Sequence, residues 1–178
     1  ADLRGGHGAG RCHRLMEQNA DILEIASQSP AVQSLARRLE NGVVLSCAGV
    51  DAGAQPFLAA ALHRCLPGRP IVFVTDGPKA QEAAQQDLET WLEAETRPLF
   101  YPGWEVLPHE GRLPHADVIS ERLEALTALL GLRKGEAPVL TVTAAALMQR
   151  TLSPDDLKRR TRRLRLGDRM EPLDLIEW

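Results

Sequence analysis

Four short apolar runs along the chain have the length and composition of buried strands. Each is rich in β-branched or aromatic residues and is flanked by segments whose apolar positions recur at helical spacing. The runs cover residues 43–47, 71–75, 98–101 and 139–143. Because helical segments separate successive runs, we expect parallel pairing with right-handed crossovers. The pattern predicts a three-layer α/β fold with a mainly parallel sheet.

Capping residues mark where the expected helices begin and end. Ser29-Pro30, Asp117, Thr143 and Ser153-Pro154 suit helix starts, because a side-chain oxygen accepts from the first free amides. Asn41-Gly42 suits a helix end, since both residues tolerate a left-handed backbone. The expected helices run from Leu15 to Ala26, from Pro30 to Leu39, from Gln55 to Leu66, from Pro78 to Trp91, from Asp117 to Leu130, from Thr143 to Arg150, and onward from Ser153.

The run at 43–47 is followed by a loop of small residues and then a helix, which is the setting of a phosphate-binding P-loop. Counted from Gly49, with Gly53 inside the loop, the second glycine position holds Ala54 and the lysine position Gln55. The hydroxyl position holds Pro56, which offers neither a hydroxyl for Mg²⁺ nor a backbone N–H. The segment therefore resembles a degenerate P-loop, which has the strand–loop–helix order but lacks the lysine and the hydroxyl that bind phosphate and Mg²⁺. We predict no bound cofactor.

The missing lysine has an energetic consequence. A hydrogen bond to a charged group contributes ~1.5–3 kcal/mol, so its loss weakens nucleotide binding by roughly 10- to 100-fold. Gln55 retains only a neutral donor, and Pro56 suits the first turn of a helix. On motif evidence alone, an ordinary strand-to-helix turn explains the segment better than a nucleotide site.

Composition and charge place the chain among ordinary soluble proteins. It has 178 residues, 44% of them hydrophobic, and a formal net charge of -3 that gives no general attraction to nucleic acid. No apolar run approaches the ~20 residues that span a bilayer, and no signal-peptide core is present. We expect a cytoplasmic protein without a membrane partner. Cys12, His13, His63 and Cys65 lack the spacing of a metal site, so no metal is predicted.

Polar residues between 104 and 122 are the remaining candidates for chemistry. His109, Glu110, His115 and Asp117 can be drawn as an acid–base group, but a solvated polar loop explains them better. Trp104 can stack a nucleic-acid base, although we favour its fastening the loop onto the sheet. Glu121 and Arg122 are expected to form a surface or interhelix ion pair. No catalytic residue is predicted.

The composition changes near the C-terminal end of the sequence. Seven cations and one acid lie between residues 158 and 169, and the alternation of Leu164 and Leu166 with arginines predicts a strand with one wet face. This face is either solvated or a docking patch for an acidic partner or a phosphate backbone. Residues 171–178 begin an amphipathic helix. We expect a leader at 1–10, a domain at 11–155, and at 156–178 the start of a truncated second α/β domain.

Three motifs in this order resemble the N-terminal module of bacterial transcription-repair coupling factors. They are Trp104–Glu110, Asp117–Leu123 and Leu147–Arg150. The tail Leu164–Asp168, with Leu173 and Leu175–Trp178, looks like the start of that module's second domain. The resemblance covers roughly residues 35–178, and the succession from Trp104-Glu105 to Glu121-Arg122-Leu123 is its most specific part.

The resemblance implies a fold similar to the first domain of the excision-repair helicase UvrB, with a decayed P-loop. Some fifteen residues separate Tyr101 from Asp117, too few for the DNA-threading hairpin of UvrB. The resemblance thus implies a non-catalytic region that neither hydrolyses ATP nor clamps DNA alone. In the family, the whole protein acts on stalled RNA polymerase and DNA through other domains and recruits UvrA through the second domain. Arg163 and Arg165 are the residues we assign to UvrA contact.

A second function remains open at this point. The chain can instead be a UvrB-like nucleic-acid-binding module of an excision-repair helicase with a weakened nucleotide site. Phosphate contacts by Arg163 and Arg165 would make its binding to duplex DNA steeply dependent on salt.

Overall fold

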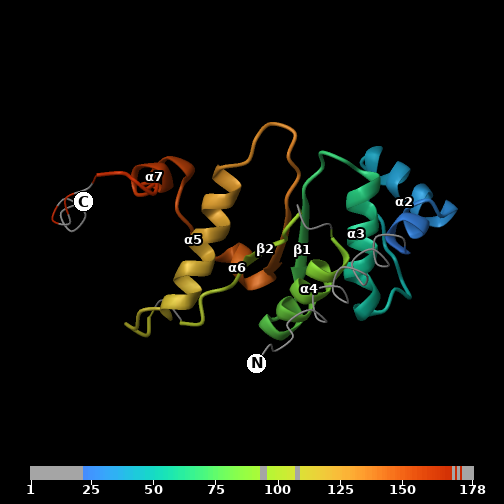
Figure 1. Cartoon of the computed structure of the whole chain (residues 1–178). Helices are drawn as coiled ribbons and strands as arrows, with labels where there is room; N and C mark the ends of the chain where they lie inside the picture. Colours follow the sequence, from blue (N-terminus) through green and yellow to red (C-terminus); the bar gives the residue numbers. More distant parts are fainter. Residues whose placement is uncertain (1–21, 93–95, 107–108, 170, 172, 174–178) are drawn as a thin grey trace, which may run out of the picture.

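Three parallel strands form the sheet at the centre of the molecule (Figure 1). The computed structural model describes residues 22–92, 96–106, 109–169, 171 and 173. Strand β1 (Ile71–Thr75) and strand β2 (Leu99–Tyr101) flank strand β3 (Val139–Thr143), so the order is β1-β3-β2. Ile71 is in register with Val139, and Leu99 with Leu140. The predicted parallel sheet is confirmed for these three runs.

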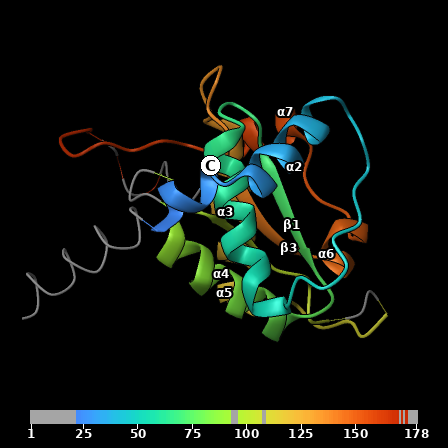
Figure 2. The same cartoon turned by 90° about the vertical axis from the view of Figure 1, so that its right-hand side faces the viewer.

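Helices cover both faces of the sheet, which confirms the layered α/β architecture (Figure 2). Val139 packs on one face with Leu88 and Ala60, whereas Val142 packs on the other with Ala125 and Ala146. Residues three apart in a strand point to opposite faces, so β3 contributes to both cores. The helices are α2 (Pro30–Glu40), the 3-10 turn η1 (Ala52–Ala54), α3 (Gln55–Cys65), α4 (Pro78–Trp91), α5 (Ala116–Leu130), α6 (Ala144–Met148) and α7 (Pro154–Arg159).

Most predicted helix caps form as the sequence indicates. The hydroxyl of Ser29 accepts from Val32 N at 3.4 Å, and that of Thr143 accepts from Ala146 N at 3.1 Å. Ser153 likewise caps α7 by accepting from Asp156 N at 3.1 Å. The predicted cap at Asp117 is wrong, because His115 is the N-cap residue of α5. Asp117 lies in the first turn, where the helix dipole favours an acid.

The end of α2 explains why the expected strand at 43–47 does not form. Gly42 has a φ of 74°, as predicted for a helix stop, and its N–H donates to Leu39 O at 3.0 Å. The N–H of Val43 donates to Arg38 O at 3.1 Å and is therefore used by the helix end. Residues 43–47 have no strand pairing, and Val44 is 97% exposed. The prediction of a strand here is wrong, and β1 is left at the edge of the sheet.

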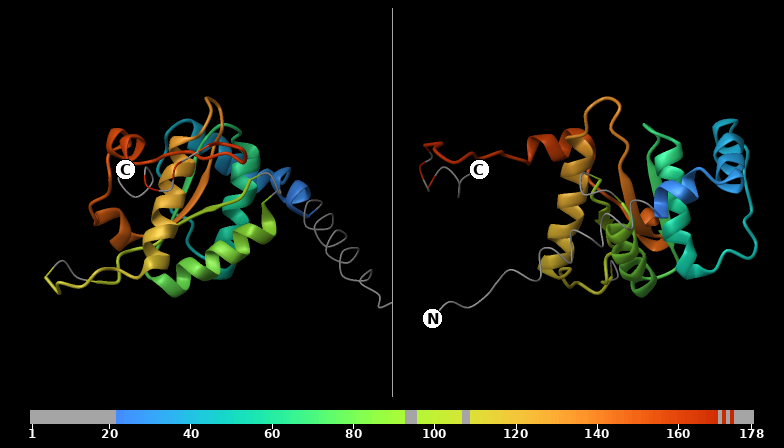
Figure 3. Two further views of the ribbon diagram at one scale, coloured as in Figure 1. Left: turned by 60° about the vertical axis from the view of Figure 1, so that its left-hand side comes forward. Right: turned by 45° about the vertical axis from the view of Figure 1, so that its right-hand side comes forward.

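The predicted strand around Leu164 and Leu166 is also wrong. The N–H of Asp168 donates to Arg165 O at 3.0 Å, and the carboxylate of Asp168 accepts from Arg165 N at 2.8 Å. These bonds close a turn that includes Gly167 at a φ of 97°, so the chain bends where we expected an extended ladder. Leu164 and Leu166 are exposed. Segment 158–169 extends from α7 on the side of α5 away from α2 and α3 (Figure 3).

Three predictions lie partly or wholly outside the described residues. The leader at 1–10 is not described, and the helix expected from Leu15 is described only from Ile22, where residues 22–27 are helical. The helix expected at 171–178 falls almost entirely outside the described range. In the part of the chain that the structure describes, no helix combines the length and apolar character that crossing a bilayer requires.

Replacing Leu88 tests the larger core. Its side chain is fully buried between α4 and the sheet, so Leu88→Ala removes packed atoms and leaves a cavity. We expect the free energy of unfolding to fall by about 2–5 kcal/mol in denaturant titrations. Met148→Ala, at an 89% exposed position, is the control and should change stability by less than about 0.5 kcal/mol. Equal effects of the two substitutions would contradict this assignment of the core.

Candidate functional site: a buried arginine and an acidic groove

Arg122 brings together three segments that are far apart in the sequence. Its side chain is 2% exposed and lies between the rings of Tyr101 and Trp104, with the guanidinium carbon 4.1 and 4.2 Å from the two ring centres. It donates to Pro102 O and to the hydroxyl of Tyr101, both at 2.6 Å. Burial lowers the pKa of Arg122, while Tyr101 acts in the opposite direction. Arginine nevertheless remains a cation in proteins.

The surface or interhelix ion pair expected at Glu121 and Arg122 is wrong for Arg122. Within the described residues no carboxylate pairs with the buried Arg122, whereas Glu121 is exposed. The two rings and the neighbouring oxygens stabilise the buried charge instead. Sequence reasoning missed this because adjacent positions on a helix point in different directions, so only one of them reaches the sheet.

Gln149 completes the arrangement around Trp104. Its Oε1 accepts from Trp104 N at 2.6 Å and from Arg122 Nη1 at 3.4 Å, while its Nε2 donates to Trp104 O at 3.2 Å. Both backbone polar groups of Trp104 are therefore held by one side chain. Trp104 thus fastens its loop as predicted, but through Arg122 of α5 and Gln149 rather than through a strand of the sheet. The three motifs of the family resemblance thus supply one connected network.

The loop after Trp104 is closed by a polar contact rather than by an acid–base group. The carboxylate of Glu105 accepts from His115 N at 2.8 Å. His115 Nδ1 lies 3.3 Å from Asp117 Oδ2, and the two side chains are 70% and 84% exposed. His109 and Glu110 are also exposed. The structure therefore agrees with the interpretation of these residues as a solvated polar loop.

A groove of about 760 Å³ runs along β2 between α4 and α5, from Arg97 and Pro98 at one end to Gly103 and Thr143 at the other. Among the described residues that line it, one side chain, Arg97, is cationic. The pKa of Glu121 is raised by its partial burial and by repulsion from Asp117, Glu124, Glu82 and Glu105. Acids on α4, on α5 and in the loop meet only after folding, so no local sequence pattern marks the groove. The carboxylates that line it belong to Asp76, Glu82, Glu89, Glu105, Glu121 and Glu124.

The residues predicted to form a degenerate P-loop lie at the start of α3, away from this groove, and no strand precedes them in the described part of the chain. Gly49 sits in a turn with a φ of 92°, and Asp51 caps η1 through Ala52 N at 2.7 Å. The N–H of Ala54 donates to Asp51 O, and that of Gln55 to Ala52 O. Gly53, Ala54 and Gln55 are exposed, whereas Pro56 is buried in the first turn of the helix. The backbone N–H groups of Ala54 and Gln55 are thus already hydrogen-bonded within the turn.

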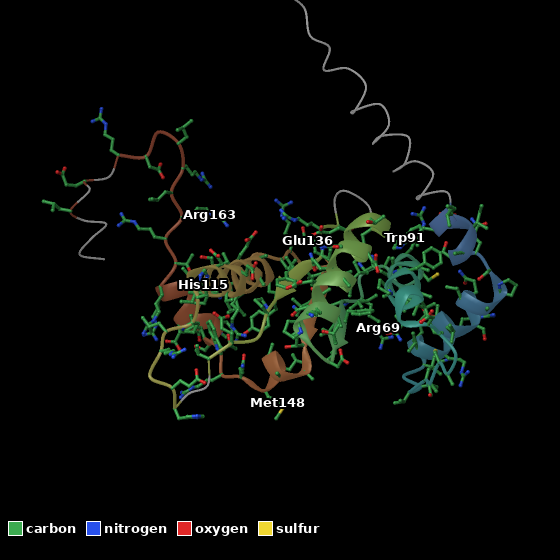
Figure 4. The ribbon with its side chains drawn as sticks, turned by 90° about the horizontal axis from the view of Figure 1, so that it is seen from below. Arg69, Trp91, His115, Glu136, Met148 and Arg163 are labelled. Carbon is green, nitrogen blue, oxygen red and sulfur yellow. The ribbon has the colours of Figure 1, made fainter. Side chains whose placement is uncertain are left out.

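Arg163 and Arg165 are exposed and are not part of the Arg122 network. Arg163 lines a shallow hollow of about 500 Å³ beside the end of α5, together with Glu124 and Glu136. Figure 4 shows Arg163 on the segment that continues from α7. Arg165 contributes its backbone to the turn closed by Asp168. Both arginine side chains are therefore open to solvent.

The four residues weighed as metal ligands are not placed together by the described part of the chain. Cys12 and His13 lie outside it. His63 Nε2 is 3.0 Å from Ala137 O, and Cys65 Sγ donates to Ser27 O at 3.4 Å. Burial raises the pKa of the Cys65 thiol. Among the described residues, no three histidine, cysteine, aspartate or glutamate side chains are arranged to hold a metal ion.

Comparison with known proteins finds a similarity over part of the chain. A transcription-repair-coupling factor of Haemophilus influenzae is 36% identical over 71 residues. These residues make up 40% of this chain and 6% of that protein, so the match covers a small part of the relative. No family model matches the chain. No solved structure matches it either. The chain therefore contains a region related to part of a transcription-repair-coupling factor.

Replacing Arg122 by lysine tests the buried network. Lysine keeps the charge but loses the planar fork and its stacking between two rings, and it leaves a buried oxygen without a donor. We expect Arg122→Lys to lower the free energy of unfolding by about 2 kcal/mol or more in denaturant titrations. Arg112→Lys, at an exposed position of the neighbouring loop, is the matched control. Identical denaturation midpoints for the two variants would show that the network contributes little to the stability of the fold.

Replacing Glu121 tests the electrostatics of the groove. Its pKa is raised above the ordinary value of 4.5, so the folded chain binds its proton more tightly than the unfolded chain. Stability should therefore fall as pH rises through the raised pKa. We expect Glu121→Gln to stabilise the protein at neutral pH and to flatten this loss between about pH 4 and 7. Thermal unfolding across that range measures it, and a destabilised variant at neutral pH would contradict it.

Proposed function

We propose that this chain is a non-catalytic region of a transcription-repair coupling factor and acts in DNA repair. The observation that carries the proposal is the 36% identity over 71 residues with a protein of that name. In this role the chain links stalled RNA polymerase to nucleotide excision repair as part of a longer protein. Contacts with RNA polymerase and DNA belong to other regions of that protein, which also supply its ATP-dependent motor.

The Arg122 network supports this proposal from the structure. Trp104, Arg122 and Gln149 come from the three motifs that resemble the coupling-factor module, and they contact one another directly. Packing against one another therefore explains why these three side chains occur in the motifs. The module is then a scaffold whose shape is maintained by this cation and its two rings.

The loop at Gly49–Pro56 supports a scaffold without nucleotide hydrolysis. A P-loop grips phosphate with free backbone amides, a lysine and a hydroxyl. Here the amides of Ala54 and Gln55 bond within the turn, and Pro56 has none. We propose that residues 49–56 bind no nucleotide.

Segment 156–178 is proposed as the start of the second domain, through which the parent protein recruits UvrA. Arg163 and Arg165 are exposed and can approach an acidic surface without rearrangement. A charged surface of this kind mainly accelerates and orients association.

A UvrB-like nucleic-acid-binding module is the second candidate. The observation that favours it is the exposed cationic segment, which has seven basic residues and one acid between residues 158 and 169. Phosphate contacts release counterions, so such a module would bind duplex DNA with a steep salt dependence.

ATP turnover and DNA binding by the purified chain separate the two candidates. The scaffold predicts no ATP hydrolysis above background and no change in that background on Gln55→Ala. It also predicts weak duplex binding whose salt slope is unaltered by Arg163→Ala with Arg165→Ala. Binding to purified UvrA should instead weaken in this double variant but not in Arg112→Ala with Arg133→Ala. Turnover abolished by Gln55→Ala, or a salt slope lost in the double variant, would favour the UvrB-like module.

A further inference from the structure

The two outer edges of the sheet are protected to different degrees. Strand β2 lies between Pro98 and Pro102, which have no backbone N–H to offer another strand. The carbonyl of Pro98 accepts from Gln85 Nε2 at 2.9 Å, and that of Pro102 accepts from Arg122 Nη1 at 2.6 Å. Prolines and covering side chains are devices that stop an edge from pairing further. The β2 edge is therefore closed.

The edge of β1 has no such cover. Ile71 N donates to Pro138 O at 3.0 Å, and alternate residues of a parallel strand face the same neighbour. The N–H and C=O groups of Val72 and Val74 therefore point away from β3. Among the described residues, no backbone hydrogen bond reaches these groups from beyond the sheet. Residues 43–50, which lead from α2 to α3, make their backbone hydrogen bonds with α2 and within the segment.

The side chains of this edge are apolar and exposed. Val72 and Val74 are in register with Leu140 and Val142, so they share the face of the sheet on which Ala125 of α5 packs. That cover stops at β3, because Val142 is fully buried whereas Val72 and Val74 are 51% and 50% exposed. Free backbone groups beside exposed valines form a template for another strand.

The sequence of the edge is complementary to itself when two copies run antiparallel. With Phe73 on a two-fold axis, Val72 of each copy faces Val74 of the other. Both valines turn their backbone groups outward, so each facing pair can exchange two hydrogen bonds. The same register brings the end that carries the exposed Arg69 beside the end that carries the exposed Asp76. Parallel pairing would instead set the two arginines together.

We propose that two copies of this chain associate through antiparallel pairing of their β1 edges. The contact is isologous, as a closed two-fold dimer requires, and it joins two sheets into one continuous sheet. Four valines meet on one face of the junction, where cross-strand apolar pairs stabilise a sheet. A strand of five residues offers a small interface, so the dimer is weak and reversible. The association is independent of the proposed role in repair.

Sedimentation velocity of the full chain tests the dimer from roughly 10 μM to 1 mM, the range of weak affinities. We expect the unaltered chain to shift from monomer to dimer across this range. Val72→Lys with Val74→Lys puts like charges opposite one another and should weaken association by about tenfold or more. Val72→Glu with Val74→Glu should do the same. An equal mixture of these two double variants should associate again, because each introduced lysine then faces an introduced glutamate.

The matched control is Leu113→Lys with Leu166→Lys, which adds the same charge at exposed apolar positions outside β1. It should associate as the unaltered chain does, and thermal unfolding checks that every variant is folded. An unaltered chain that stays monomeric throughout the range would overturn the dimer. Association that persists in the β1 variants, or is lost equally in the control, would overturn the β1 edge as its site. Failure of the mixture to associate would overturn the antiparallel register.

Discussion

The packing of one buried cation, Arg122, organises the functional half of the molecule. A charge is costly to bury unless its donors are satisfied, and here carbonyl, hydroxyl and amide oxygens satisfy them between two aromatic rings. The loop after β2 and the end of α6 are held in place because they supply these partners. Stabilising a cation without a carboxylate also leaves the neighbouring acids on the surface rather than drawing one of them into the core.

The remaining charges are unevenly distributed. Acids of α4 and α5 line the groove along β2, and seven of the 21 lysine and arginine residues lie on segment 158–169. The proposed scaffold role depends on the exposed arginines of this segment, which can meet a partner.

Two errors of sequence interpretation have the same physical origin. Residues 43–47 and 164–166 have the apolar pattern of strands, but local hydrogen bonds take priority over sheet pairing. The helix end at Gly42 consumes the amide of Val43, and Asp168 with Gly167 closes a turn on Arg165. Apolar periodicity describes which side chains prefer burial; it does not account for the backbone donors that a flanking turn has already used.

The sequence by itself determined three strands, most helix boundaries and three of the caps, because periodicity and capping depend on residues close together in the chain. It also identified Trp104 as the residue that fastens its loop. Only the tertiary structure decided that Arg122 is buried between Tyr101 and Trp104, that Gln149 joins them, and that six acids share one groove. These contacts join positions up to 45 residues apart, and no local pattern records such distances.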